Sequence, residues 1–148
     1  MEIWLVEGTQ VLVQKRSFLK DTNPGKLDVS CAGHVSAGAC ILESAVRELN
    51  EELGLNVDNL GQPLFIAPCV SKGTGPGGAP YVDRELVSVF KKELALTSID
   101  FTIATSEVET LMLMEADTVI ASLRNKDDTF ISKPHYYIDA LADSLLNK

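Results

Sequence analysis

Three glutamates lie close together in the run Arg47-Glu48-Leu49-Asn50-Glu51-Glu52. On an α-helix, residues three and four positions apart share a face, so the three carboxylates would project together from one turn. Neighbouring like charges cost roughly 0.2–0.5 kcal/mol per pair in an isolated helix, and something must offset that cost. Carboxylate oxygens on a rigid helix suit a hard divalent cation such as Mg²⁺ or Mn²⁺. The run therefore predicts either a metal site or a solvated acidic face.

The glutamates belong to an amphipathic helix that follows a glycine-bounded loop starting at Gly33. Gly38 permits the turn into this helix, and Gly54 supplies the left-handed residue with which many helices end. Apolar residues at helical spacing form the stripe that we expect to be buried: Leu42, Ala45, Val46, Leu49 and Leu53. The sequence thus predicts a packed helix that holds its carboxylates on a rigid support.

The stretch from Gly33 to Leu55 resembles the Nudix box, G-x5-E-x7-R-E-U-x-E-E-x-G-U, where U is an aliphatic residue. Eight of nine defined positions match, and position 39 is alanine where the pattern has glutamate. The segments Q-K-R-S and K-D-T-x-P-G-x-x-D-V-S-x-A-G-H resemble the Nudix subgroup related to isopentenyl-diphosphate isomerase. The resemblance implies an α/β/α sandwich. It also implies Mg²⁺- or Mn²⁺-dependent hydrolysis of a nucleoside or other organic diphosphate linked to a moiety X.

The resemblance also implies a role for individual side chains. Arg47 would hold the glutamates through charge-assisted hydrogen bonds, and Glu48 would also orient the attacking water. No organic cofactor is implied. The implied residues are the metal ligands Glu48, Glu51, Glu52, Ala32 (through its carbonyl) and Glu85; the catalytic group Glu48, Glu51 and Arg47; and the substrate contacts Arg16 and His34.

Two other functions stay open beside the hydrolase. A catalytically weakened domain could bind a nucleotide or diphosphate as a sensor: Ala39 favours this, whereas the intact R-E-x-x-E-E favours an enzyme. Isopentenyl-diphosphate isomerases place a cysteine directly before the G-H pair, where this chain has Ala32; Cys31 would point to the opposite face of a strand. The isomerase is therefore the least favoured function. We also hypothesise that Glu43, four residues before Arg47, replaces the missing brace at position 39.

The remaining elements predict an α+β fold in which helices cover both faces of a mixed sheet. Pro68 indicates an edge strand or a bulge. Glu107 and Glu109 are candidates for an auxiliary base, although a charge at the entry of a strand is the simpler interpretation. The expected elements are a hairpin within 3–13, strands at 28–31, 65–70, 82–90 and 106–114, a glycine-proline loop at 71–80, and helices at 115–123 and 135–146.

Composition predicts one domain over residues 1–148. A net charge of −8 leaves no basic footprint for a nucleic-acid polymer. The three cysteines are odd in number and widely spaced, which indicates reduced thiols in a cytoplasmic protein. The N-terminal residues show no signal peptide or membrane span. The expected partner is a small-molecule diphosphate. The sequence specifies neither that substrate nor the oligomeric state, a homodimer included.

Overall fold

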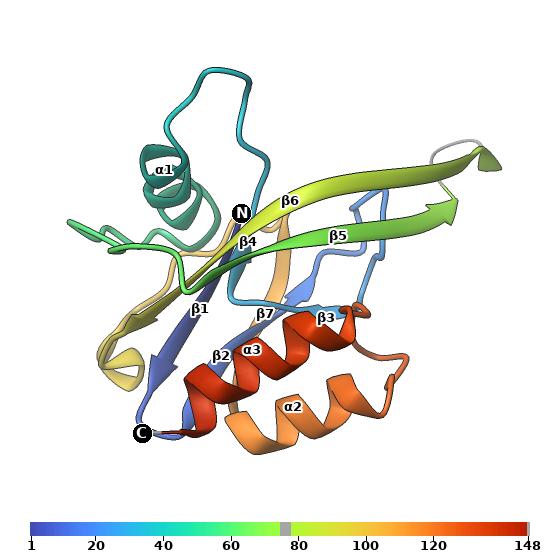
Figure 1. The fold of residues 1–148 in the computed structure, drawn as a ribbon. Coiled ribbons are helices and arrows are strands. Elements are labelled where there is room, and N and C mark those ends of the chain that lie inside the picture. Colours follow the sequence, from blue (N-terminus) through green and yellow to red (C-terminus); the bar gives the residue numbers. More distant parts are fainter. Residues whose placement is uncertain (75–77, 148) are drawn as a thin grey trace.

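The segment that carries the three glutamates is helix α1 (Ile41–Leu53), which covers one face of a mixed β-sheet (Figure 1). The computed structural model describes residues 1–74 and 78–147. The other elements are β1 (Glu2–Glu7), β2 (Gln10–Arg16), β3 (Leu27–Asp28), β4 (Cys31–Ala32), β5 (Phe65–Thr74), β6 (Pro80–Glu93), the 3₁₀ helix η2 (Leu96–Ser98), β7 (Val108–Glu115), α2 (Ala116–Arg124) and α3 (His135–Leu146).

The strands form a sheet in the order β3-β2-β1-β6-β5, with β4 paired to β1 and β7 paired to β2. β1 and β6 run parallel, and every other pair is antiparallel. α1 lies on one face, and α2 and α3 lie side by side on the other (Figure 1). This arrangement confirms the predicted α+β sandwich.

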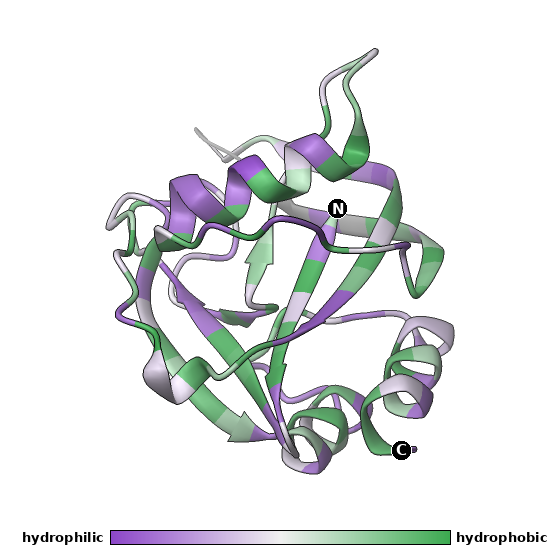
Figure 2. Cartoon of the chain, turned by 90° about the vertical axis from the view of Figure 1, so that its left-hand side faces the viewer, coloured by the Kyte–Doolittle hydropathy of each residue, from purple (hydrophilic) through white to green (hydrophobic). Residues whose placement is uncertain are grey.

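Strand β1 shows why both faces of the sheet need a covering layer. Its side chains alternate between the faces, and both faces are buried. Ile3 and Leu5 join the core beneath α1, whereas Trp4 and Val6 join the core beneath α2 and α3. Figure 2 shows that hydrophobic and hydrophilic residues also alternate along α1, as expected for a helix with one face on a core. Because β1 serves two cores, its sequence reads as an unbroken apolar run.

Helix α1 ends as the sequence predicts. Gly54 adopts φ 66° and ψ 18°, and its N–H donates to the carbonyl of Asn50. Gly38 also has a positive φ, of 81°, in the loop before the helix. Of the predicted stripe, Ala45, Leu49 and Leu53 are fully buried, and the other two members pack at its border.

Two predicted elements differ from the structure. The strand expected at 28–31 is two short strands, because the chain leaves β2 at Asp28 and joins β1 at Cys31. Ser30 bridges the gap: its hydroxyl accepts from the N–H of Leu5 and donates to the carbonyl of Leu12. The loop expected at 71–80 is also too long, because β5 and β6 continue their pairing from Ser71↔Asp83 to Thr74↔Pro80. The rest of that expected loop includes residues 75–77, which lie outside the described residues.

Pro68 lies on an edge strand, as its type predicts. Strand β5 is paired on one side only, with β6. The Pro68 carbonyl accepts a hydrogen bond from the Tyr136 hydroxyl and so points away from β6. The position therefore faces the open edge, where a missing N–H costs no ladder hydrogen bond.

Candidate active site

Gly33 allows helix α1, which carries the box glutamates and is called the box helix below, to lie close to the loop that precedes it. Its N–H donates to the carbonyl of Met1 at 3.1 Å, which fixes this backbone beside β1. A Cβ at this position would lie 2.8 Å from both Cγ and Cδ of Glu48 and 3.2 Å from its Oε1. Only glycine leaves the Glu48 side chain its place against the backbone of residue 33.

The three carboxylates of α1 differ in exposure. The Glu51 side chain is 59% exposed and that of Glu48 is 19% exposed, whereas Glu52 is buried. Burial raises the pKa of Glu52 to about 7, a hydrogen bond from Cys31 opposes the rise, and the charges of Glu107 and Glu48 add to it. Oε2 of Glu52 has no hydrogen-bond partner among the described residues. A buried carboxylate with an unpartnered oxygen is a group that a cation would satisfy, so this site fits a divalent metal.

The thiol of Cys31 supports α1 and is not a nucleophile. The side chain is fully buried in the core beneath α1, and it donates to Glu52. Burial and the nearby carboxylates hold its pKa far above the ordinary value, so the reactive thiolate is disfavoured. Ala32 occupies the next position and lines the cleft with no thiol to offer.

Arg47 contacts two of the box glutamates. Its Nη2 lies 3.5 Å from Oε1 of Glu48, and its Nε lies 3.7 Å from Oε1 of Glu51. Within the described part of the chain its ion pairs do not include Glu43, so the hypothesis that Glu43 braces Arg47 is wrong. The two carboxylates that follow Arg47 in the helix hold the guanidinium. Ala39, where the box pattern has glutamate, is exposed in the loop before α1.

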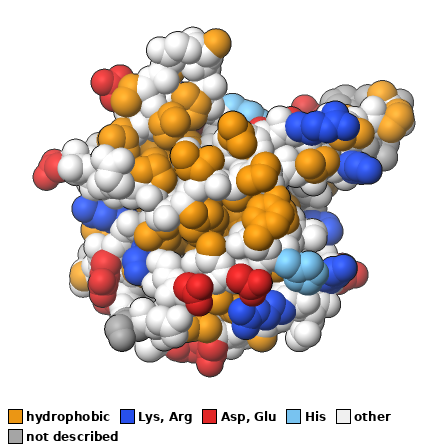
Figure 3. Space-filling view, in the orientation of Figure 1, with side chains coloured by type: hydrophobic (Ala, Val, Ile, Leu, Met, Phe, Trp, Pro, Cys, Tyr) orange, Lys and Arg blue, Asp and Glu red, His pale blue; other side chains and the backbone are white. Residues whose placement is uncertain are grey.

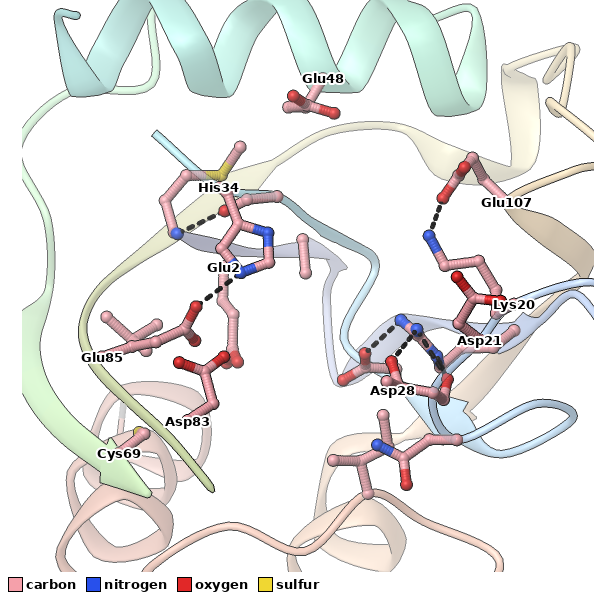
Figure 4. A pocket seen from close by; sticks show the side chains of 18 of the residues that line it. Glu2, Lys20, Asp21, Asp28, His34, Glu48, Cys69, Asp83, Glu85 and Glu107 are labelled. Carbon is pink, nitrogen blue, oxygen red and sulfur yellow. Dashed lines mark hydrogen bonds and ion pairs between the residues drawn. The ribbon is translucent and has the colours of Figure 1, made fainter. Parts of the chain in front are cut away.

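Facing α1, β6 and the box loop bring together a second group of ligand-type side chains. Nε2 of His34 lies 2.6 Å from Oε1 of Glu85. Asp83, two residues earlier on the same face of β6, completes the group, and one ligand atom from each of the three residues lies within 4.8 Å of the others. Figure 4 shows Glu48 pointing from α1 toward the space beside these side chains.

Basic side chains on the floor of the site are neutralised by acids. Arg16 donates to the carbonyl of Thr22 at 3.0 Å, and its Nη1 lies 3.6 Å from Oδ2 of Asp28. Nζ of Lys133 lies 2.5 Å from Oε1 of Glu2 and 3.5 Å from Oδ1 of Asp28. Burial alone would lower the pKa of Lys133, but the two carboxylates hold it above its ordinary value.

A further ion pair joins Lys20 and Glu107, which lie on the other side of the view in Figure 4 from His34 and Glu85. Both side chains are partly buried. Glu107 therefore faces the site but is already paired, while Glu109 is exposed and does not line it.

The three box glutamates, the group of His34, Asp83 and Glu85, and the basic side chains Arg16, Lys20 and Lys133 line one cleft of about 1110 Å³. Every residue expected as a metal ligand or substrate contact borders this cleft, and Arg47 reaches it through the glutamates. The sequence pattern names Glu107 as a candidate base but does not place Glu2, Lys20, Asp28, Asp83 or Lys133 at the site. Nine carboxylates line the cleft, against three lysine and arginine side chains: Glu2, Asp21, Asp28, Glu48, Glu51, Glu52, Asp83, Glu85 and Glu107, against Arg16, Lys20 and Lys133. A polyanionic ligand would therefore enter only with accompanying cations.

Comparison with known protein families identifies the domain. The NUDIX domain family model matches residues 3–134. The chain therefore belongs to the Nudix domain family.

Two curated relatives show the range of the family. An uncharacterized Nudix hydrolase of Clostridium acetobutylicum is 36% identical over 129 residues, which are 84% of this chain and 60% of that protein. An isopentenyl-diphosphate Delta-isomerase of Cutibacterium acnes is 33% identical over 89 residues, which are 60% of this chain and 44% of that protein. The chain thus spans less than two thirds of the length of these relatives.

Solved structures share the fold at low sequence identity. A protein of Deinococcus radiodurans has a TM-score of 0.61 at 17% identity, over 94% of this chain and 78% of that one. The NUDIX domain of Shewanella oneidensis NrtR, complexed with ADP ribose, has a TM-score of 0.53 at 14% identity, over 99% and 86%. Separately, no helix in the described residues has the length and apolar character to cross a lipid bilayer.

Proposed function

We propose that this chain, as one Nudix domain, hydrolyses a nucleoside or other organic diphosphate linked to a moiety X. The observation that carries the proposal is the convergence of Glu48, Glu51 and Glu52 with Ala32 and Glu85 on one cleft. Family membership supports the same chemistry, and the structure of the NrtR domain with ADP ribose supports a small-molecule diphosphate as ligand.

Divalent cations, Mg²⁺ or Mn²⁺, are the proposed cofactors. The residues that would hold them are Glu48, Glu51 and Glu52 from α1, the carbonyl of Ala32 and the carboxylate of Glu85. When bound, such an ion neutralises the diphosphate and lowers the pKa of the water molecule that attacks phosphorus. The unpartnered oxygen of Glu52 and the excess of carboxylates in the cleft are the features that fit it.

The chain's own side chains position the reactants. Glu48 is held between Gly33 and Arg47, and its carboxylate accepts a proton from the attacking water or orients it. Arg47 is a positioning residue, because it reaches the cleft only through Glu48 and Glu51. Arg16 and His34 contact the substrate from the floor and the mouth of the cleft.

The sensor remains a second candidate on one observation, the alanine at position 39. Because Ala39 is exposed in the loop before α1 and does not line the cleft, its effect on the carboxylates is indirect. The isomerase is disfavoured, since Ala32 offers no thiol and Cys31 is buried away from the cleft.

Three unpaired cysteines suit a reducing compartment, and we place the protein in the cytoplasm.

A panel of organic diphosphates tests this function. The chain is incubated with nucleoside diphosphate sugars, dinucleoside polyphosphates and prenyl diphosphates, with Mg²⁺ or with a chelator, and the products are identified by mass spectrometry. We expect cleavage of at least one member that stops when the metal is removed. Tight binding of a member without cleavage would support the sensor instead, and conversion of isopentenyl to dimethylallyl diphosphate would support the isomerase.

A further inference from the structure

The floor of the cleft holds a chain of polar groups that the proposed hydrolysis does not use. Lys133 donates to Glu2 at 2.5 Å, and its Nζ lies 3.5 Å from Oδ1 of Asp28. Tyr137 donates to the other oxygen of Glu2 and accepts from Nε1 of Trp4 at 3.0 Å. The side chains of Glu2, Asp28 and Lys133 are only 12%, 5% and 9% exposed, yet all three residues border the cleft. We call Glu2 and Lys133 the floor pair.

The floor pair is held rigidly from behind. Trp4 and Tyr137 belong to the core beneath α2 and α3, and the ring of Phe65 meets that of Tyr137 edge-on, with the centroids 5.2 Å apart. These packed rings fix the Tyr137 hydroxyl and, through it, the carboxylate of Glu2. A buried ion pair is often no more stabilising than apolar side chains of similar volume. Charged groups fixed at the base of a cleft are, in contrast, typical of a recognition site.

The register of the sheet places the floor pair beside the proposed metal ligands. Glu2 pairs directly with Ala32 across β1 and β4. Residues opposite each other in an antiparallel pair have Cα atoms about 4.5–5.5 Å apart. Figure 4 shows Glu2 between the side of the cleft that carries Glu85 and the side that carries Asp28. The group attached to a diphosphate at the box glutamates would therefore lie over the floor pair.

The charges around the floor pair favour a neutral group over an anion. Glu2 and Asp28 both face Lys133, and Asp28 also pairs with Arg16 at 3.6 Å. Two carboxylates thus cancel two cations, and no positive charge is left over for a phosphate. Asp83 adds a further carboxylate to the lining of the cleft. A phosphate group at this point of the cleft would be repelled unless a metal ion accompanied it.

An apolar group matches the floor no better. It would remove water from Glu2 and Lys133 and would offer no hydrogen bond in return. Figure 3 shows hydrophobic side chains gathered on the outer surface over β5 and the start of α3, where Tyr136 does not line the cleft. Apolar side chains that do line it and are at least half exposed belong to its rim and not to its floor: Leu19, Val70 and Val82.

Hydroxyl groups match the floor pair in both directions of hydrogen bonding. A hydroxyl donates to a carboxylate and accepts from an ammonium group. Each oxygen of Glu2 has a second lone pair beyond the one already used, and the ammonium of Lys133 has three N–H groups for its two carboxylate partners. Two neighbouring hydroxyls, as a sugar carries, can therefore bridge Glu2 and Lys133 without displacing Asp28 or Tyr137.

We propose that Glu2 and Lys133 bind neighbouring hydroxyl groups of moiety X and so select a sugar-bearing diphosphate over a prenyl diphosphate. The inference rests on the proposed function, because it names the part of that substrate which the floor pair contacts. It makes Glu2 and Lys133 specificity-determining residues and gives them no part in the attack on phosphorus.

An NMR titration with two phosphate monoesters tests the floor pair without requiring hydrolysis. Ribose 5-phosphate carries neighbouring hydroxyls, whereas isopentyl phosphate has the same charged group and no hydroxyl. With Mg²⁺ present, wild type should bind ribose 5-phosphate at least about tenfold more tightly than isopentyl phosphate. Glu2→Gln and Lys133→Met should each reduce this preference to under about threefold, because each removes one of the two charged partners of the hydroxyls.

Val119→Ala is the control for loss of stability. Val119 lies on α2 in the core behind the floor pair and does not line the cleft, so its truncation should keep the wild-type preference. The amide spectrum shows whether each variant is folded. If Lys133→Met does not fold, Glu2→Gln carries the test, because glutamine keeps the shape of the side chain that Tyr137 contacts.

The ratio of the two affinities decides the outcome. A wild type that binds both esters equally, or binds neither, would overturn the proposal. Variants that change the affinity for both esters by the same factor would overturn it too, because the floor pair would then act on the phosphate. A diphosphate panel without any cleavage would refute the hydrolase alone, since the preference between the esters needs no hydrolysis.

Discussion

Replacing Gly33 with alanine should slow hydrolysis about a hundredfold and leave the fold intact. The new Cβ would lie 2.8 Å from Cγ and Cδ of Glu48, and ordinary contact begins at 3.4 Å. The Glu48 side chain must therefore retreat by about 0.6 Å or adopt another rotamer. A displacement on the order of 1 Å at a catalytic group costs about 10²-fold in rate. The φ of Gly33 is not in the left-handed region, so alanine adds no backbone strain there.

The assay compares kcat/KM of wild type and Gly33→Ala on the best substrate of the panel, with thermal melting and calorimetric titration of Mn²⁺ on the same samples. Gly8→Ala is the matched control, because Gly8 has a φ of 62° and no atom within 4 Å of a new Cβ. It should lower stability by about 1–2 kcal/mol and leave kcat/KM unchanged. Full activity in Gly33→Ala, or equal rate losses in both variants, would refute the role given to Gly33.

Three further substitutions separate metal binding, positioning and stability. Glu52→Gln should weaken Mn²⁺ binding and activity by at least about 10–100-fold, and wild-type affinity in calorimetry would contradict its place among the ligands. Arg47→Ala should slow turnover by about 10–100-fold yet change the free energy of unfolding by under about 1 kcal/mol, because its ion pairs are half-exposed; urea titration checks this. Lys133→Met should lower the free energy of unfolding by roughly 3–5 kcal/mol, because Glu2 and Asp28 lose their buried cation. Since the pKa of Lys133 is raised, the stabilisation from its ion pairs should be complete up to pH 10.5, the ordinary pKa of a lysine, and be lost only as the pH rises further. A urea midpoint unchanged by Lys133→Met would show that these ion pairs do not stabilise the fold.

The box helix could be predicted because its determinants are local. The apolar period, the left-handed Gly54 and the spacing of the glutamates all lie within one segment, so the sequence shows them directly. The hairpin of β1 and β2 follows from the same kind of local pattern around Gly8. Pro68 likewise indicated an edge, because a missing N–H is tolerated in few other places.

The rest of the site depends on contacts between distant segments. Lys133 meets Glu2 across 131 positions, and no local pattern marks either residue. Asp83 gave a weaker signal, because it lies two residues before Glu85 and so on the same face of a strand. The Glu43 hypothesis failed because helical spacing offers Arg47 acidic partners on both sides, and it is Glu51 that the guanidinium meets.

Strands β5 and β6 are also longer than the sequence predicts. Glycine and proline between residues 71 and 80 indicate a loop, but the cross-strand register still pairs Gly73 with Tyr81 and Thr74 with Pro80. Pairing with a neighbouring strand can hold residues whose own preference for the extended conformation is low. The consequence is functional, since this ribbon places Asp83 and Glu85 at the cleft.

The central claim is that the carboxylates of α1 direct metal-dependent attack of water on a diphosphate. The most direct test is a reaction in ¹⁸O-labelled water with Mg²⁺, in which mass spectrometry locates the label in the products. The account predicts ¹⁸O in one phosphoryl product of wild type, and almost none when Mg²⁺ is chelated or in Glu52→Gln. Cleavage that proceeds equally in Glu52→Gln, or no label in any phosphoryl product across the whole panel, would contradict it.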